Sequence, residues 1–497
     1  MSEHENPATN FRSELHFLLG AEQISLNLNT GEFRPTTTVL EWLRATGNTG
    51  TKEGCAEGDC GACTVVIGKL DNTTGSGDII YQAIDSCLVF LPMIDGAQLI
   101  TVEQLRNPTE LHPVQKAMVD HDASQCGFCT PGIIMSLFGL YREALAGIKF
   151  DQNQIQDALS GNLCRCTGYK SIMAAAVEAL SDPEPDLFDT EMAKQREALS
   201  SLSTNSLLIA RSDQLYCRPS TLKMALEIYS ETPSMLPFTG ATDIALRVTK
   251  NHEILPALLD LGGIKSLHYI TQDHKSVRIG ASVSLERVRL LVADSHPELA
   301  SIIGVFGSKQ IRELASLGGN IGSASPIGDT IPVLMAYDAE VELRALSGTR
   351  RVPLKEFITG YRKTDRQAGE LITAVHLPAL TDKVKVIALK ASKRRDLDIA
   401  TASLAIRLML KQETVHSLSL FYGGMAEMPK QAFKTQEALI GKDWNLENIK
   451  EVQPLLREDF TPITDARSEA ESRAILAANL LELAWHRSTE KKRKKHE

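Results

Sequence analysis

Eight cysteines in two groups constrain this chain more than any other feature, because thiols at that density are held together by metal or by disulfides. The first group follows the pattern C-x4-C-x2-C, and a fourth cysteine comes after 23 further residues; its members are Cys55, Cys60, Cys63 and Cys87. This spacing is typical of a plant-type [2Fe-2S] site, in which one loop supplies three thiolates and a distant turn supplies the fourth. The first group therefore predicts a two-iron cluster.

The second group combines a C-x2-C pair with a C-x-C pair, and its members are Cys126, Cys129, Cys164 and Cys166. The first pair stands in QCGFCTPG, where Thr130 is a suitable N-cap and Pro131 a suitable first residue of a helix. Free backbone N–H groups and the positive end of the helix dipole favour thiolates at such a place. Four sulfurs at two helix ends can enclose a second cluster.

The cysteines are also compatible with zinc or with disulfides. Four-cysteine zinc sites use the same residue type, although zinc ribbons tend to use two C-x2-C pairs and neither group does. The disulfide interpretation is weaker, because the polar N-terminus lacks a secretory signal and the compartment is therefore expected to be reducing. Cys217 has no neighbouring cysteine and is expected to be a structural thiol. Iron-sulfur clusters are the favoured interpretation.

Length and composition exclude several classes of function. A chain of 497 residues suggests roughly three domains of about 150 residues each. The hydrophobic fraction of 43% is ordinary for a soluble protein, and a net charge of -9 argues against nucleic-acid binding. No stretch of about 18 apolar residues is present, so we expect no membrane span and a cytoplasmic location. The basic ending KKRKKHE is expected to be a solvated chain end.

Hydrophobic patterns divide the chain into regions. Strands are expected in SELHFLLG, EQISLNLN, CTVVIGKL and GDIIYQAI, with a helix in TTVLEWLRAT. From about 100 to 180 the pattern is helical and predicts a small bundle. Residues from about 182 to 215 carry Pro, acids and Ser/Thr with little apolar periodicity, which is typical of a linker. From about 383 onward we expect sheet strands, followed by an amphipathic helix in SEAESRAILAANLLELAWHR.

Two glycine-rich segments are candidate ligand-binding backbone. LPFTGATDIAL contains a tight Gly turn whose N–H groups can hold a pyrophosphate, but such a turn alone is a weak signal and no G-x-G-x-x-G motif accompanies it. SLGGNIGSASPIGD is more informative, since its small and hydroxyl residues make little sense as core. Its composition is better suited to backbone moulded around a polar ligand.

The segments GTKEGCAEGDCGACTVV, QCGFCTPGIIMS and GNLCRCTGYKSI resemble the iron-sulfur portion of the molybdenum hydroxylases, the xanthine dehydrogenase family. The resemblance extends through GGNI, ASPI and GYRKT to the end of the chain, and it implies an α+β multidomain fold. The implied parts are a β-grasp 2Fe-2S ferredoxin-like domain (13–97), a four-helix 2Fe-2S domain (98–182), a linker (183–209), a two-part α+β FAD-binding domain of vanillyl-alcohol-oxidase-like fold (210–382), a C-terminal flavoprotein α+β domain (383–487) and a basic tail (488–497).

The same resemblance implies the residues that contact FAD. Eight residues would line the flavin pyrophosphate: Pro237, Phe238, Thr239, Gly240, Ala241, Thr242, Asp243 and Ile244. Phe306 would stack on the isoalloxazine ring, although a core phenylalanine is the alternative. The remaining contacts would be Ser316, Gly319, Asn320, Asp329, Ile372 and Lys390. Ala241 departs from the family's usual GGTD or GNTE and must still allow close approach of the backbone.

The charged segment KASKRRDLDIA is by its residues a solvated loop between two strands. In the resembling family, the similar loop borders the flavin and influences whether NAD+ or oxygen accepts the electrons. The resemblance thus implies that Lys393, Arg394 and Arg395 attract an anionic dinucleotide. Asp396, which with Asp398 follows these cations, would tune the potential near the flavin.

The resemblance implies a division of labour, because the family's molybdopterin domain has no counterpart in this sequence. A molybdopterin-binding large subunit would convert hypoxanthine and xanthine to urate, and this chain, the small subunit, would pass the electrons through two [2Fe-2S] clusters to FAD and on to NAD+. The expected assembly is an αβ dimer of dimers, without nucleic acid or membrane, and no catalytic residue for hydroxylation is expected here. The alternatives are a related aldehyde or heterocycle hydroxylase, or a zinc-stapled scaffold or electron carrier.

Overall fold

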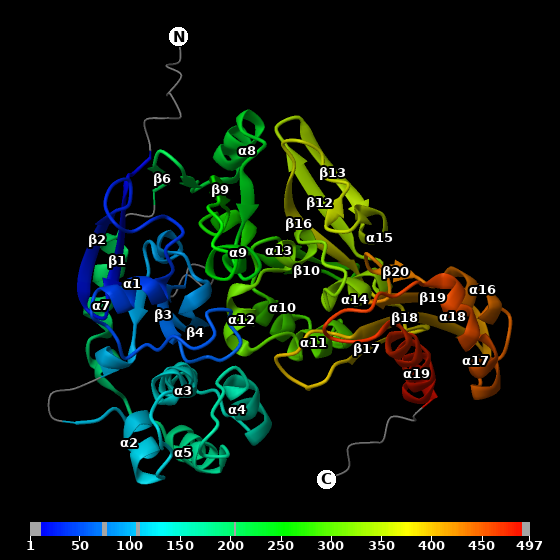
Figure 1. Cartoon of the computed structure of the whole chain (residues 1–497), viewed down its shortest axis with the longest axis horizontal. Helices are drawn as coiled ribbons and strands as arrows, with labels where there is room; N and C mark the ends of the chain where they lie inside the picture. Colours follow the sequence, from blue (N-terminus) through cyan, green and yellow to red (C-terminus); the bar gives the residue numbers. More distant parts are fainter. Residues whose placement is uncertain (1–10, 72–76, 106–109, 203–204, 490–497) are drawn as a thin grey trace. The chain divides into compact units, whose positions relative to one another are not determined.

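The computed structural model describes residues 11–71, 77–105, 110–202 and 205–489, so the predicted tail lies outside it from residue 490 on (Figure 1). The chain forms two compact units. Unit 1 comprises Met1–Lys265 and Gly307–Ala315, and unit 2 comprises Ser266–Phe306 and Ser316–Glu497. Unit 1 is therefore built from two separate stretches of sequence.

The first sheet of unit 1 has the strand order β2-β1-β5-β3-β4. Its elements are β1 (Glu14–Leu19), β2 (Glu22–Asn27), α1 (Val39–Ala45), β3 (Thr64–Leu70), β4 (Ile79–Asp85) and β5 (Gln98–Ile100). The four longer strands and the helix lie where the sequence predicts them. Thr38 and Glu41 form a capping box that begins α1, and Trp42 packs edge-on against Phe17 beneath it. Strand β5 was not predicted; it pairs with β1 and β3, so this sheet extends past the predicted boundary at residue 97.

Four helices follow and share one core with the adjoining face of the first sheet. They are α2 (Pro113–Asp120), α3 (Thr130–Leu145), α4 (Gln152–Leu159) and α5 (Lys170–Ser181). Helix α3 is buried on nearly every side, which explains why its sequence is apolar throughout rather than striped. Thr130 is its first residue and Cys129 its cap, so the predicted cap at Thr130 is one residue late.

The predicted linker contains two helices, α6 (Leu187–Thr190) and α7 (Met192–Ser201). A buried ion pair holds α6 in place, because Arg142 of α3 donates to Asp186 at 2.7 Å and to Asp189 at 2.7 Å. His112 also bonds Asp186, at 3.0 Å. Apolar side chains also attach this segment, because Phe188, Leu199 and Leu202 are buried in the core shared with the four helices; the sequence prediction of a linker overlooked them.

A second sheet completes unit 1 with the order β6-β7-β9-β8. Its elements are β6 (Leu207–Ala210), β7 (Leu215–Arg218), α8 (Leu222–Glu231), β8 (Leu236–Phe238), α9 (Ala245–Thr249) and β9 (Ala257–Asp260). Helix α12 (Lys309–Leu314) comes much later in the sequence and packs on α4 and β4 of the same unit. Arg312 of α12, fully buried, forms an ion pair with Asp157 at 2.7 Å.

Unit 2 begins with a sheet of order β10-β11-β16-β12-β13 and a two-stranded β14-β15 ribbon. The strands are β10 (Ile270–Gln272), β11 (Ser276–Gly280), β12 (Glu340–Ala345), β13 (Gly348–Pro353), β14 (Ile358–Gly360), β15 (Lys363–Thr364) and β16 (Leu371–Pro378). The helices are α10 (Leu285–Leu291), α11 (Pro297–Gly304), α13 (Leu317–Gly322), α14 (Thr330–Ala336) and α15 (Leu354–Phe357). Gly318 of α13 lets the helix approach Ala281 backbone to backbone.

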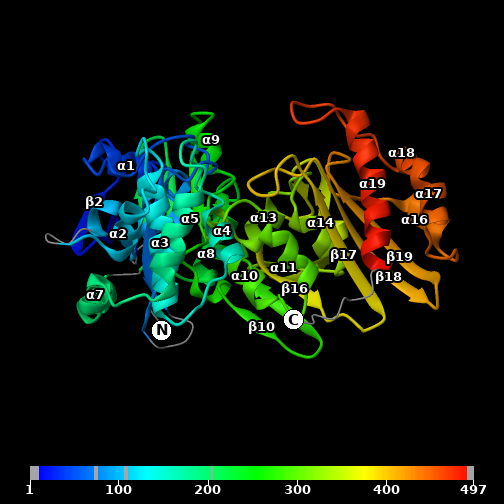
Figure 2. The same ribbon diagram turned by 90° about the horizontal axis from the view of Figure 1, so that it is seen from below.

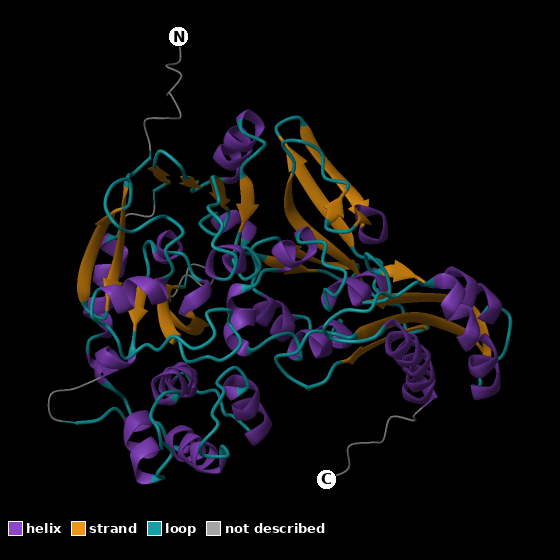
Figure 3. Ribbon diagram, in the orientation of Figure 1, coloured by secondary structure: helices purple, strands orange, loops and turns teal. Residues whose placement is uncertain are grey.

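The rest of unit 2 is an antiparallel sheet of order β17-β18-β19-β20 covered by helices (Figures 2 and 3). Its elements are β17 (Val384–Ala391), β18 (Ala402–Lys411), β19 (Thr414–Gly423), β20 (Lys430–Gln431), α16 (Phe433–Leu439), α17 (Leu446–Val452), α18 (Leu456–Asp459) and α19 (Ala470–Thr489). The three long strands and α19 confirm the elements expected there. Ala477 and Leu481 on α19 are buried in the core of this sheet.

Candidate functional site

The first cysteine group occupies the loop before β3 and a short turn after β4. Cys55, Cys60 and Cys63 lie in the loop, and Cys87 lies in the 3-10 turn Ser86–Leu88. The thiols contact each other in two pairs, Cys55 with Cys60 and Cys63 with Cys87. A [2Fe-2S] cluster needs two thiolates on each of two irons. The paired arrangement matches this donor set.

Backbone donors favour a negative sulfur in this loop. Cys55 Sγ accepts the N–H groups of Glu57 at 3.4 Å and of Asp59 at 3.3 Å. The contact with Cys60 and these N–H groups lower the pKa of Cys55 to about 5, against the opposing effect of burial. Conversely, burial and then the charge of Cys55 raise the pKa of Asp85 to about 8. Asp85 Oδ1 lies 3.8 Å from Cys63 Sγ, a neighbour that cysteine spacing did not indicate.

The second cysteine group joins the start of α3 to the turn between α4 and α5. Cys126 Sγ lies 3.6 Å from Cys166 Sγ, and the thiols of Cys129 and Cys164 form the other pair. Burial would raise the pKa of Cys164, but the hydroxyl and N–H of Thr167 lower it to about 7. Cys126 and Cys166 are exposed. This group too is divided into two pairs.

No three His, Cys, Asp or Glu side chains surround a single metal position in the part of the chain that the structure describes. A structural zinc ion requires four ligands around one atom. Thiols gathered two by two match the two irons of a [2Fe-2S] cluster, each of which takes two thiolates.

A buried amide joins the two cysteine loops. Asn162, 2% exposed, donates through Nδ2 to the carbonyl of Gly61 at 3.0 Å and to Thr64 Oγ1 at 3.1 Å. Its Oδ1 accepts from Ser136 Oγ at 2.6 Å and from Gln310 Nε2 at 3.1 Å. Sequence reasoning missed Asn162, although its place two residues before Cys164 in GNLCRC is a signal for it. We call Asn162, Ser136 and Gln310 the amide clamp.

The predicted pyrophosphate turn, residues 237–244, lies in unit 1 between β8 and α9. Only glycine fits at position 240, because a Cβ there would stand 1.7 Å from the carbonyl oxygen of Leu314. Ala241 has a φ of 58°, a left-handed conformation that favours glycine. The alanine that departs from the resembling sequences therefore adopts a conformation that glycine or asparagine adopts more readily.

The other predicted FAD contacts lie in unit 2. Ser316 caps α13 by accepting the N–H of Gly319 at 3.0 Å, and Asn320 Oδ1 accepts the hydroxyl of Thr330. Ile372 is a buried residue of β16, and Phe306 is half-buried rather than fully in the core. The structure thus explains part of the glycine-rich sequence by the capping and tight packing of α13.

Asp329 and Lys390 form a buried ion pair, with Nζ and Oδ2 2.7 Å apart. Lys390 Nζ also donates to the carbonyl of Val305 at 2.8 Å. Burial raises the pKa of Asp329 to about 6, while Lys390 acts in the opposite direction. Asp329 Oδ1 is buried and has no hydrogen-bond partner among the described residues. An unsatisfied acceptor next to a lysine is suited to a polar donor of a bound ligand.

The charged segment 390–400 begins with the last two residues of β17, and from Ser392 on it is a loop that leads to β18. Lys393, Arg394 and Arg395 are exposed, whereas Asp398 accepts the N–H of Arg394 at 2.8 Å and shapes the turn. The cationic side chains are thus presented to solvent.

Comparison with known families assigns each region. Residues 28–84 match the 2Fe-2S iron-sulfur cluster binding domain, and 101–177 match the [2Fe-2S] binding domain. Residues 210–380 match the FAD binding domain in molybdopterin dehydrogenase, and 387–488 match the CO dehydrogenase flavoprotein C-terminal domain. Xanthine dehydrogenase of Emericella nidulans is 31% identical over 86% of this chain, and xanthine dehydrogenase/oxidase of Rattus norvegicus is 31% identical over 87%.

The chain belongs to the molybdenum hydroxylase family. It spans 35% and 36% of the length of these two relatives, so it corresponds to the iron-sulfur and FAD region of a molybdenum hydroxylase. Among solved structures, CO dehydrogenase from Oligotropha carboxidovorans has a TM-score of 0.51 at 24% identity and covers 55% of this chain and 96% of its own. Quinoline 2-oxidoreductase from Pseudomonas putida 86 has a TM-score of 0.51 at 21% identity, covering 55% and 95%. These two likenesses concern the fold.

The residues present fit the cofactors of a molybdenum hydroxylase. Each cysteine group offers four thiols in two pairs; seven of the eight cysteines lie in the matched 2Fe-2S domains, and Cys87 lies three residues beyond the match to 28–84. The glycine turn is packed closely on the backbone of Leu314, and Asp329 offers an unsatisfied acceptor. Within the described ranges, no helix is long and apolar enough to cross a membrane.

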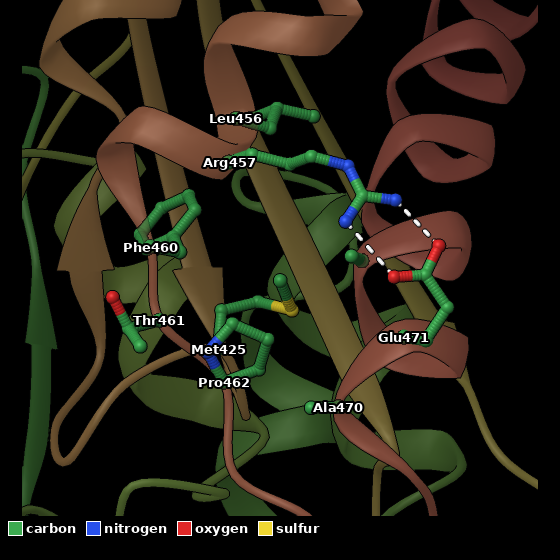
Figure 4. Close-up of a pocket in the computed structure, with 9 residues that line it drawn as sticks. Met425, Leu456, Arg457, Phe460, Thr461, Pro462, Ala470 and Glu471 are labelled. Atoms are coloured by element: carbon green, nitrogen blue, oxygen red, sulfur yellow. Dashed lines mark hydrogen bonds and ion pairs between the residues drawn. The ribbon is translucent and has the colours of Figure 1, made fainter.

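A separate pocket in the flavoprotein C-terminal domain of this molybdenum hydroxylase has a volume of about 250 Å3 (Figure 4). Met425, Leu456 and Phe460 form its apolar side, and Arg457 and Glu471 form an ion pair beside it. Both charged groups are exposed and satisfy each other. The pocket contains none of the predicted cofactor residues.

Proposed function

We propose that this chain is the electron-transfer small subunit of a xanthine dehydrogenase, serving a molybdopterin-binding large subunit that converts hypoxanthine and xanthine to urate. Two [2Fe-2S] clusters and FAD supply one-electron and two-electron redox chemistry when bound, and NAD+ is the proposed final acceptor. The observation that carries the proposal is the presence of two sets of paired thiols and a flavin domain in one chain related over 86% of its length to xanthine dehydrogenase.

The protein's own residues would perform five tasks. The eight clustered thiolates would hold the iron, and the amide clamp would fix one cysteine loop against the other. Residues 237–244 would surround the pyrophosphate. Phe306 and Ile372 would contact the flavin ring, while Ser316, Gly319, Asn320 and the Asp329–Lys390 pair would bind its polar groups.

The exposed loop 393–398 is the proposed NAD+ contact. Lys393, Arg394 and Arg395 present positive charge to solvent, and such charge raises the local concentration of an anionic dinucleotide. Replacing all three with Gln would therefore raise the KM for NAD+ and make that KM less sensitive to salt.

The molybdopterin-binding large subunit is part of the proposal, which places it with this chain in an αβ dimer of dimers. Relatives named xanthine dehydrogenase extend well beyond the region matched here. Copurification with a molybdenum-containing chain tests this.

The decisive experiment starts from the purified complex. Xanthine added without oxygen should bleach the absorption of the oxidised flavin, at about 450 nm. NAD+ added afterwards should restore that absorption and form NADH. Bleaching by an aldehyde or another N-heterocycle but not by xanthine would favour the alternative hydroxylases. A colourless, zinc-containing protein would rule out both and leave the zinc-stapled scaffold.

A further inference from the structure

One lysine from the flavin-domain sequence reaches the first cysteine loop. Lys250 caps the C-terminal end of α9, the short helix that follows the pyrophosphate turn. Its Nζ donates to the backbone carbonyl of Cys55 at 2.9 Å and lies 3.4 Å from Glu57 Oε2. All three residues lie in unit 1.

The cation stands out because its surroundings are acidic. Glu53, Glu57 and Asp59 flank Cys55 in the same loop. The side chains of Lys250 and Glu57 are 44% and 43% exposed, so solvent screens this pair without removing its effect. Lys250 therefore adds positive charge next to Cys55, in a loop that itself carries the acids Glu53, Glu57 and Asp59 and one lysine, Lys52.

We propose that Lys250 sets the reduction potential of the first cluster, by favouring its reduced form electrostatically. The inference rests on the proposed function, since it requires a [2Fe-2S] cluster on Cys55, Cys60, Cys63 and Cys87. Reduction adds one electron and no proton, so the centre becomes more negative by one charge and no bond forms or breaks. A nearby cation stabilises that added charge, and net charge around a cluster is a determinant of its potential.

The lysine and the cluster ligands come from different domains of the sequence. The ligands come from the ferredoxin-like sequence, whereas the lysine comes from residues matched to the FAD-binding domain. The lysine at the end of α9 would thus make the first cluster easier to reduce than it would be with the charges of the cysteine loop alone.

The test measures the midpoint potential of the first cluster by redox titration of its EPR signal in the intact complex. Lys250→Gln keeps a hydrogen-bond donor and loses the charge. It should shift the equilibrium toward the oxidised cluster about threefold, which for a one-electron couple is a fall of roughly 30 mV in the midpoint potential. Glu57→Gln removes the opposing charge and should shift the potential upward. Lys250→Arg should retain the wild-type value.

Loosening of the loop would shift the midpoint potential of both variants in the same direction. Opposite shifts in Lys250→Gln and Glu57→Gln therefore cannot arise from loosening. The difference in midpoint potential between each variant and the wild type should also shrink at high salt, because salt screens exposed charges. The matched control is Lys223→Gln, which alters another exposed lysine whose Nζ is 3.8 Å from Glu227. It should leave the potential unchanged.

Each outcome decides the proposal. Unchanged potentials in Lys250→Gln and Glu57→Gln, with the EPR signal present, overturn the role of Lys250 and leave the proposed function standing. If Lys250→Gln fails to assemble the cluster, the Glu57→Gln shift alone decides. Absence of any cluster signal in the wild type contradicts the proposed function itself.

Discussion

The ammonium group of Lys390 lies 2.7 Å from Asp329 Oδ2, and the two side chains are only 4% and 8% exposed. The second carboxylate oxygen, Oδ1, is buried without a hydrogen-bond partner in the described part of the chain. Two opposite charges thus satisfy each other out of water and leave one acceptor available to a ligand.

Breaking this pair should destabilise unit 2 strongly. Lys390→Met leaves the carboxylate of Asp329 buried without its counter-ion, a change that costs about 3–5 kcal/mol of unfolding free energy. Lys434→Met is the matched control, because the Lys434–Glu458 pair is more than half exposed and should change stability by about 1 kcal/mol or less. Urea unfolding of both variants checks this; equal losses would contradict it.

Gly240→Ala should displace the pyrophosphate turn. The new Cβ would meet the Leu314 carbonyl at 1.7 Å, which is backbone and cannot rotate away. We expect a loss of about 3 kcal/mol or more and a lower FAD content per purified chain. Gly304→Ala adds a methyl group with nothing closer than 3.9 Å and should leave both quantities near wild type. Full flavin occupancy in Gly240→Ala would argue against the proposed turn.

Cys126→Ser should remove the second cluster and spare FAD. Serine is a poor ligand where a thiolate is required, so iron per chain should fall by about half while flavin content persists. Electron flow from the molybdenum partner to FAD should cease, whereas Cys217→Ala should retain all the iron. Urate formation coupled to NAD+ at the wild-type rate in Cys126→Ser would refute the relay.

Glu342 should make unit 2 sensitive to acid. Burial alone would raise its pKa, but hydrogen bonds from His376, Arg278 and Thr373 lower it to about 2. The folded-state pKa lies below the ordinary value of 4.5, so the stabilisation is complete above pH 4.5 and is lost as the pH falls toward 2.

Glu342→Gln should therefore be less stable than wild type at pH 7, and the gap should close as the pH falls from about 4.5 toward 2. Glu340→Gln on the same strand provides the control, since Glu340 is 42% exposed and 3.9 Å from Arg351. Its difference from wild type should be small across this range. Denaturation midpoints at several pH values measure both, and a constant gap for Glu342→Gln would be the contrary result.

The sequence predicted the main elements and the two sets of cysteines because these carry local signals. Alternating apolar residues mark β1 to β4, and cysteine spacing marks the loops. Spacing cannot say which thiols become neighbours, and the pairing of Cys126 with Cys166 emerges only from the fold. Strand β5 has three residues, too few for a pattern to stand out.

Features that depend on distant partners escaped the sequence. The linker prediction missed the helices of residues 187–201, which are held in place by Arg142 and by the burial of Phe188 and Leu199 in a core formed by distant segments. The amide clamp joins residues from three separate segments, so no local pattern reveals it. Ala241 is a departure from the resembling sequences, and only the structure shows that it adopts a left-handed φ of 58°, a conformation that favours glycine.

Helix α12 has a consequence for how the chain can be divided. A fragment ending at residue 265 would contain every clustered cysteine yet would lack α12 and Ser308 before it. Three glycines are packed against that missing segment: Gly58 against Ile311, Gly161 against Gln310 and Ser308, and Gly240 against Leu314. Such a fragment would expose these surfaces to water, so unit 1 cannot be excised with a single cut.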